Sequence, residues 1–400
     1  MVGNGFDLAH GLPTKYSDFL YFMALCIDHL TQWRNWRVYR DSDNEPEQLA
    51  EQKALEGILL KPHKNTRVKN IFDENIAHIK NTFTESHFKD FAMNDLLLYF
   101  LCIYDFRQNL ESNFQWIDLE AELMHLLEYL NKLPDKKTYT TTVPHLTNDR
   151  MVLQTFLLST LNGYLKKLTK TPREKIKSMM FAHLFEQLEQ LSSLLKFYLK
   201  LVLDDFYKEP QKVFQFSPKI DACFPVTHII SFNYTNTFSI YNPDADVYYV
   251  NGCLTDTNII LGTENTFPSV DKSYVDNNLH LFFKNVQRIL YDFSYKHTKW
   301  LNSRETLVHN NANGKNTIDH NNNVYIVGHS LAFSDKNILL DIFENADHVT
   351  IFYYSYSDKI DKLANLYKIL PDELFYRYIN NDDTNSKISL KPQSDISLAD

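Results

Sequence analysis

The sequence predicts an α/β protein in which a parallel sheet is interrupted by a large helical insertion. Short apolar or β-branched runs, typical of buried strands, occur at 226–232, 247–250, 258–261, 324–327 and 348–354. Segments with helical spacing follow them, at 274–301, 335–345 and 358–369. Strands that alternate with helices favour a parallel sheet. From about 119 to 207, apolar residues recur every three or four positions with little sign of a strand, which indicates a block of helices.

These patterns divide the chain into four parts. We expect residues 1–30 to hold the first strand stub, a glycine turn and a helix of the α/β domain, and residues 216–380 to hold its remainder. Residues 31–215 are predicted to be the mostly helical insertion, and residues 381–400 a flexible tail. Ligands of parallel sheets bind at the carboxyl ends of the strands, where glycines and polar residues of this chain collect.

Composition bounds the function. A chain of 400 residues with 44% hydrophobic residues can bury a large core, which excludes a disordered protein. The net charge of −9 repels phosphate backbones, so nucleic acid is an unlikely partner. No apolar run exceeds nine residues, whereas a membrane-spanning helix needs roughly 20, and no membrane association is expected. Four dispersed cysteines without ligand spacing predict a reducing, cytoplasmic location and no metal site.

The densest motif lies at the head of the chain. Gly3, Gly5 and Gly11 fall within the first eleven residues, and a glycine turn that follows a strand lets the backbone approach a nucleotide phosphate. The third glycine of the dinucleotide fingerprint is absent because Leu8 takes its place, so a purely structural turn is an equal alternative. The first strand is reduced to Met1–Val2. Either it begins upstream of this sequence, or the sheet tolerates a stub.

The string GNGFDLAHGLPTKYSDFL, residues 3–20, closely resembles the opening motif of the AbiH family of bacterial abortive-infection proteins. Three later motifs follow in the order of that family, namely WIDLE at 116–120, SFNYT at 231–235, and GHSL at 328–331 with Asp335. The resemblance covers roughly residues 1–370 and implies a role in defence against phage. In the WIDLE motif, Asp118 and Glu120 also suit a helix N-terminus without any catalysis.

AbiH proteins in turn resemble sirtuin-like domains, whose Rossmann-type fold binds NAD and in several bacterial defence proteins hydrolyses it. The resemblance therefore implies a Rossmann-like, sirtuin-related parallel sheet with a large all-helical insertion, and NAD as substrate or ligand. The implied catalytic residues are Asn233, Asp7, His329 and Asn251. The implied NAD-binding residues are Gly3, Asn4, Gly5, Phe6, Asp7, Tyr234, Gly252, Gly328, Ser330 and Asp335.

The sequence departs from the sirtuin-like pattern at Asn251–Gly252, where the pattern has His–Gly. An asparagine cannot accept a proton at neutral pH, although it can hydrogen-bond a ribose hydroxyl. Three alternatives remain open. Asp7, His10 or His329 supplies a base; or no base is needed because nicotinamide leaves through an oxocarbenium-like state; or the nucleotide is bound without turnover.

Several residues also have purely structural interpretations. Asn233 could cap the next helix, His329 could satisfy a loop carbonyl, and Asp335 could start a helix.

Two competing functions follow. One is a nucleotide-binding sensor or partner-binding toxin that does not turn the nucleotide over. The other is a nucleic-acid enzyme, which requires the cationic and aromatic segment at 33–40 to face the same cleft as the motifs. A homo-oligomer and an unidentified phage trigger are further possible partners.

Overall fold

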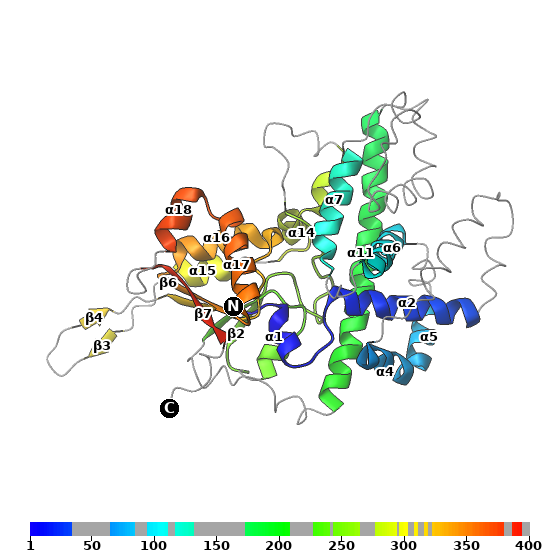
Figure 1. Cartoon of the computed structure of the whole chain (residues 1–400), viewed down its shortest axis with the longest axis horizontal. Helices are drawn as coiled ribbons and strands as arrows, with labels where there is room; N and C mark the ends of the chain where they lie inside the picture. The colour runs from blue at the N-terminus through cyan, green and yellow to red at the C-terminus, as the bar shows by residue number, and fades with distance from the viewer. Residues whose placement is uncertain are drawn as a thin grey trace. The chain divides into compact units, whose positions relative to one another are not determined.

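The computed structural model describes residues 1–33, 65–84, 94–110, 117–131, 173–208, 227–240, 243–264, 277–293, 296–302, 308–310, 316–318, 322–379 and 386–393. The chain forms two compact units (Figure 1). The first contains residues 1–12, 206–259 and 288–400, and the second contains residues 13–205 and 260–287. None of the helices in these described ranges is both long and apolar enough to cross a membrane.

A parallel sheet organises the first unit. Its strands are β1 (His228–Ser231), β2 (Asp246–Tyr249), β5 (Asn323–Ile326), β6 (His348–Tyr353) and β7 (Ile388–Pro392). β1 pairs with β2, and β6 lies between β5 and β7, all in parallel. Val2 forms parallel bridges to Ser231 on one side and to Val327 on the other. The order across the first unit is therefore β2, β1, the Val2 stub, β5, β6 and β7.

The stub occupies a central position although it is only two residues long. On one side, Val2 N donates to Ile230 O and Phe232 N donates to Val2 O, both at 2.9 Å. On the other side, Gly3 N donates to Val327 O at 3.1 Å, and Val327 N donates to Met1 O at 3.0 Å. The ladder groups of the stub that face both neighbours are thus satisfied.

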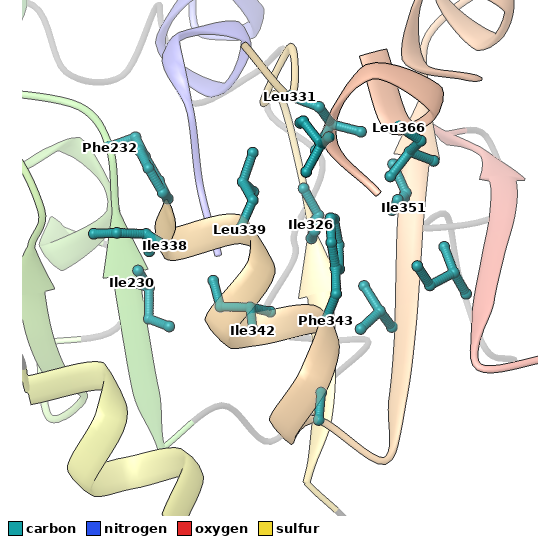
Figure 2. Packing of buried hydrophobic residues seen from close by; sticks show 14 of the residues in the cluster. Ile230, Phe232, Ile326, Leu331, Ile338, Leu339, Ile342, Phe343, Ile351 and Leu366 are labelled. Carbon is teal, nitrogen blue, oxygen red and sulfur yellow. The ribbon is translucent and has the colours of Figure 1, made fainter. Parts of the chain in front are cut away.

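Alternation along the strands supplies a core on each face of the sheet. On one face, the main cluster includes Ile230, Ile326 and Ile351, which pack against Ile338, Leu339, Ile342 and Phe343 of helix α16 (Figure 2). The neighbouring residues Ile229, Val327 and Phe352 join Val2, Phe6 and Phe238 in a second cluster. Because adjacent strand residues point to opposite faces, this division follows from the period of two in the sequence.

Helices and turns complete the first unit. They are α1 (Asn4–Ala9), η4 (Thr237–Ile240), α15 (Lys296–Asn302), η6 (Phe333–Asp335), α16 (Lys336–Asn345), α17 (Tyr356–Ile369) and α18 (Asp372–Tyr378). Two short strands, β3 (Val308–Asn310) and β4 (Asn316–Ile318), pair antiparallel with each other. The helices predicted at 335–345 and 358–369 are confirmed as α16 and α17.

The described part of the second unit is mostly helical. It contains α2 (Tyr16–Trp33), α4 (Thr66–Glu74), α5 (Ile76–Thr84), α6 (Asp95–Leu110), α7 (Leu119–Asn131), η5 (Leu279–Phe282) and all but the last three residues of α11 (Arg173–Lys208). Helix α14 (Lys284–Leu290) begins in this unit and ends in the first. Helix α11 carries the apolar stripe that the sequence predicts. All seven of its members are buried, namely Phe181, Leu184, Leu188, Leu191, Leu195, Tyr198 and Val202.

The mixed α/β character with parallel strands is confirmed, but three expectations differ from the structure. Residues 258–261 are buried in part yet form no strand. The helix expected over 274–301 is divided into η5, α14 and α15 within its described residues. Residues 388–392, expected to lie in a flexible tail, form β7 beside β6. Of the segment 33–40, residues 34–40 lie outside the described residues.

Gly328 offers a direct test of the packing beside the stub. It has φ +64°, and a Cβ added there would lie 2.7 Å from the carbonyl carbon of Gly5, which is backbone that cannot turn aside. We expect Gly328→Ala to lower the free energy of unfolding by more than about 3 kcal/mol, measured by chemical denaturation. Gly11→Ala is the matched control, because Gly11 is exposed and also has a positive φ of 72°. It should cost only about 1 kcal/mol, and equal losses would contradict the packing argument.

Candidate functional site

The residues that the sequence singles out gather at the carboxyl ends of the parallel strands of the first unit. Residues 3–7 follow the stub, and Asn233 and Tyr234 follow β1. Asn251 and Gly252 follow β2, while residues 328–330 and Asp335 follow β5. Hydrogen bonds join these loops, because Asn233 Nδ2 donates to Gly3 O at 3.1 Å and Leu254 N donates to Tyr234 O at 3.0 Å. The motifs thus form one polar edge of the sheet.

The spacing of Gly3 and Gly5 is explained by close contact between backbones. A Cβ on Gly3 would lie 2.7 Å from the Cα of His329, and one on Gly5 would lie 2.7 Å from Gly328 O. Gly5 N also donates to Gly328 O at 2.7 Å, and Phe6 N donates to Gly3 O at 2.8 Å. In this structure these two amides of the first turn of α1 are therefore used within the protein.

Asp7 is the central titratable group of this edge. It is 1% exposed, and Thr235 Oγ1 donates to its Oδ2 at 2.5 Å. Burial raises the pKa of Asp7 from its ordinary value of 3.8 to about 6, although Thr235, Thr237 and Asn233 nearby lower it in part. A carboxyl group with this pKa can both accept and release a proton close to neutral pH.

Three side-chain oxygens around Asp7 are buried without a hydrogen-bond partner in the described part of the chain. They are Asp7 Oδ1, Asn233 Oδ1 and Thr237 Oγ1. The three residues are 1%, 6% and 1% exposed. Buried polar atoms are normally satisfied by protein, water or ligand, and an unsatisfied one is costly. These three oxygens therefore have hydrogen-bonding capacity that the described residues do not satisfy.

His10 is the C-cap of α1, the helix that carries Asp7. Its Nδ1 donates to Phe6 O at 2.6 Å, which assigns the proton to Nδ1 and leaves Nε2 as the basic atom of the neutral ring. Burial lowers the pKa of His10, partly offset by the Phe6 carbonyl. The ring is therefore predominantly neutral at physiological pH.

His329 is held from both sides of its ring. Its Nδ1 accepts from Leu331 N at 2.9 Å, so the proton lies on Nε2, which is 3.4 Å from Asp335 Oδ2. The ring also packs edge-on against Phe232, with centroids 4.3 Å apart. Both ring nitrogens face protein groups, which suits a residue that fixes the loop after β5 better than one that removes a proton from a ligand.

Asn251 is paired with a residue that sequence reasoning missed. Arg288 Nη2 donates to Asn251 Oδ1 at 3.1 Å, and Arg288 Nε donates to Val250 O at 3.2 Å. Both side chains are buried. Arg288 lies inside a helical segment far along the chain, where nothing local distinguishes it. Thr235, by contrast, belongs to the SFNYT motif and could have been chosen for its hydroxyl.

The other predicted site residues mainly make contacts within the protein. Phe6 belongs to the second core cluster, with its ring centroid 5.4 Å from that of Phe238. Gly252 has φ +78°, and a Cβ there would lie 2.8 Å from the ring of Phe293. Ser330 accepts from Asn365 Nδ2 through its carbonyl oxygen, and Asn4 is half-buried at the start of α1.

The acidic motif at 116–120 belongs to the second unit. Asp118 Oδ1 accepts from the backbone amides of Glu120 and Ala121, at 3.0 and 3.1 Å, and so caps α7. Glu120 Oε2 lies 2.8 Å from Lys284 Nζ in a buried ion pair. Tyr16 also donates to Glu120, at 3.4 Å. The motif therefore anchors α7 to α2 and α14 within that unit.

The fold and this edge define a mixed α/β protein whose polar motif residues converge at the carboxyl ends of parallel strands. A profile of the family described as Bacteriophage abortive infection AbiH matches residues 1–356. The chain belongs to the AbiH family, which confirms the resemblance drawn from its motifs and supports a role in bacteriophage abortive infection. No curated protein and no solved structure gives a significant match.

The raised pKa of Asp7 predicts a pH dependence of stability. As pH rises from about 4 to 6, the unfolded chain ionises first, so the native state loses stability; the shift from 3.8 to about 6 corresponds to about 3 kcal/mol. We expect Asp7→Asn to gain stability relative to the unaltered protein across this window, and to differ little in slope below it. Denaturation at a series of pH values measures this, and a pH-independent difference would contradict it.

Proposed function

We propose that this AbiH protein binds an NAD-type dinucleotide at the carboxyl ends of its strands and hydrolyses it, depleting NAD in an infected cell. The proposal assigns the strands of the first unit to a Rossmann-like, sirtuin-related fold. The observation that carries the proposal is the group of unsatisfied buried oxygens on Asp7, Asn233 and Thr237. A group of buried polar oxygens of this kind suits a water molecule and a ribose better than an apolar ligand.

The residues suggest how hydrolysis would proceed. The bond between the nicotinamide nitrogen and C1′ of the ribose breaks, and nicotinamide leaves with the bonding electron pair. A water molecule held by Asn233 Oδ1 then attacks C1′ through its oxygen. Asp7 accepts the proton that this water loses, because its pKa of about 6 leaves it mostly ionised at neutral pH. No proton acceptor is then required at Asn251.

Asp7 is preferred over the two histidines as the proton acceptor. His329 Nδ1 already accepts from Leu331, and its other nitrogen faces Asp335. His10 Nε2 is basic, but its ring packs 4.4 Å from that of Phe6 at the core-facing side of α1. Asp7, in contrast, shares its surroundings with Asn233 and Thr237.

A second candidate function is a nucleotide sensor without turnover. It is favoured by one observation, the engagement of Asn251 Oδ1 by Arg288, because this oxygen is the only acceptor atom of the side chain that replaces the expected histidine. This candidate predicts that NAD is bound and recovered intact.

The decisive measurement is the loss of NAD and release of nicotinamide by the purified protein, alone and with phage lysate. Asn233→Ala and Asp7→Asn should each lower the rate by at least about 100-fold, because one orients water and the other accepts its proton. Asn345→Ala is the matched control, since Asn345 is an exposed asparagine on α16 that donates to Asp341 O. Turnover unchanged by Asn233→Ala would overturn the catalytic assignment. NAD bound but intact would favour the sensor.

A further inference from the structure

Arg288 is a buried cation without a matching anion. Its side chain is 1% exposed, and its two hydrogen bonds go to uncharged oxygens, Val250 O and Asn251 Oδ1. Within the described part of the chain it forms no ion pair with a carboxylate. Its nearby titratable neighbour is His297, another potential cation. Buried charges are normally paired, because an unpaired one loses its hydration without compensation.

This arginine fixes which end of the Asn251 amide faces away from it. A guanidinium group has only N–H donors, so the atom of Asn251 that it contacts must be the carbonyl oxygen. The Nδ2 group therefore points elsewhere, and it has no hydrogen-bond partner among the described residues. The amide of Asn251 is thus held at its oxygen by the positive charge of Arg288, and its Nδ2 group is left as a hydrogen-bond donor.

The donor lies on the same strand edge as the proposed NAD site. β1 and β2 end side by side, since Ser231 pairs with Tyr249 and Val250 N donates to Ser231 O at 2.8 Å. Leu254 N, in the loop after Asn251, donates to Tyr234 O in the loop that also holds Asn233. A ligand that reached the Asn251 side chain would meet an N–H group on an amide whose oxygen is held by the Arg288 cation.

We propose that Asn251 and Arg288 form an anion-recognition pair that selects a phosphate-bearing nucleotide over the uncharged nucleoside. Asn251 contacts a phosphate oxygen through Nδ2, and Arg288 is the positioning residue that orients the amide and supplies the charge. The placement of the ligand rests on the proposed function. The bound phosphate provides the negative charge that the protein itself does not bring to Arg288, which explains why a cation is buried beside a neutral amide.

Asn251→Asp separates this role from a structural one. The change is nearly isosteric and gives Arg288 a carboxylate partner, so thermal unfolding should shift to a higher temperature. It also removes the donor and cancels the charge, so affinity for ADP, measured by calorimetry, should fall at least about tenfold while affinity for adenosine stays unchanged. Asn345→Asp is the matched control because it adds the same charge at an exposed site. Arg288→Met should also weaken ADP binding if it folds.

Several results would contradict an anion-recognition role for Asn251 and Arg288. One is an Asn251→Asp protein that is stabilised but binds ADP as tightly as the unaltered chain. Another is an equal loss of ADP affinity in Asn345→Asp. A third is an unaltered protein that binds ADP no more tightly than adenosine. Each would make Arg288 a structural residue only.

The failure of this inference is distinct from the failure of the proposed function. If ADP binds in a manner that depends on Asn251 but NAD is neither bound nor hydrolysed, the NAD proposal falls and the phosphate site stands. If NAD is hydrolysed in a manner that depends on Asn233 while Asn251→Asp changes no affinity, the phosphate site falls and the NAD proposal stands.

Discussion

The pairing of Val2 with strands on both sides is the constraint on which the first unit depends. Without it, β1 and β2 would be separate from β5, β6 and β7, since these groups have no other ladder between them among the described strands. The backbones of Gly3, Gly5 and Gly328 approach closely, so the start of α1 packs directly against the loop after β5 at the strand ends.

Much of this arrangement could be predicted from the sequence, because local patterns and the parallel topology agree. Short β-branched runs followed by polar residues gave β1, β2, β5 and β6, and parallel strands necessarily bring their carboxyl ends to one edge. The run at 258–261 looked the same but is not a strand. Its carbonyl groups find other partners, as when Gln287 Nε2 donates to Leu261 O at 3.1 Å. Apolar composition reports burial, and a strand also needs a neighbour with which to pair.

The remaining features depend on residues far apart in the chain. β7 reads as a polar tail with a terminal proline, yet an edge strand beside β6 tolerates both. Arg288 and Asn251 are 37 positions apart, and the Glu120–Lys284 ion pair spans an even longer separation. Neither pair leaves a periodic signal, because a single contact does not repeat. The sequence places the acidic residues of 116–120 at a helix N-terminus, and Asp118 does cap α7, whereas the ion pair of Glu120 with Lys284 depends on the fold.

The glycines at positions 3 and 5 serve backbone packing, which differs from the role of glycines in a phosphate-binding turn. In a phosphate-binding turn, glycines leave room for the ligand, and the first amides of the helix point at it. Here the room at Gly3 and Gly5 is filled by the backbone of Gly328 and His329, and Gly5 N donates to Gly328 O. A nucleotide bound at this edge must therefore be recognised chiefly by side chains. Two sets are suited to the task, and they differ in charge: the oxygens around Asp7 accept hydrogen bonds, whereas Asn251 with Arg288 behind it donates one. An edge with acceptors beside β1 and a cation-backed donor beside β2 favours a ligand that is itself divided, with hydroxyl groups at one end and an anion at the other.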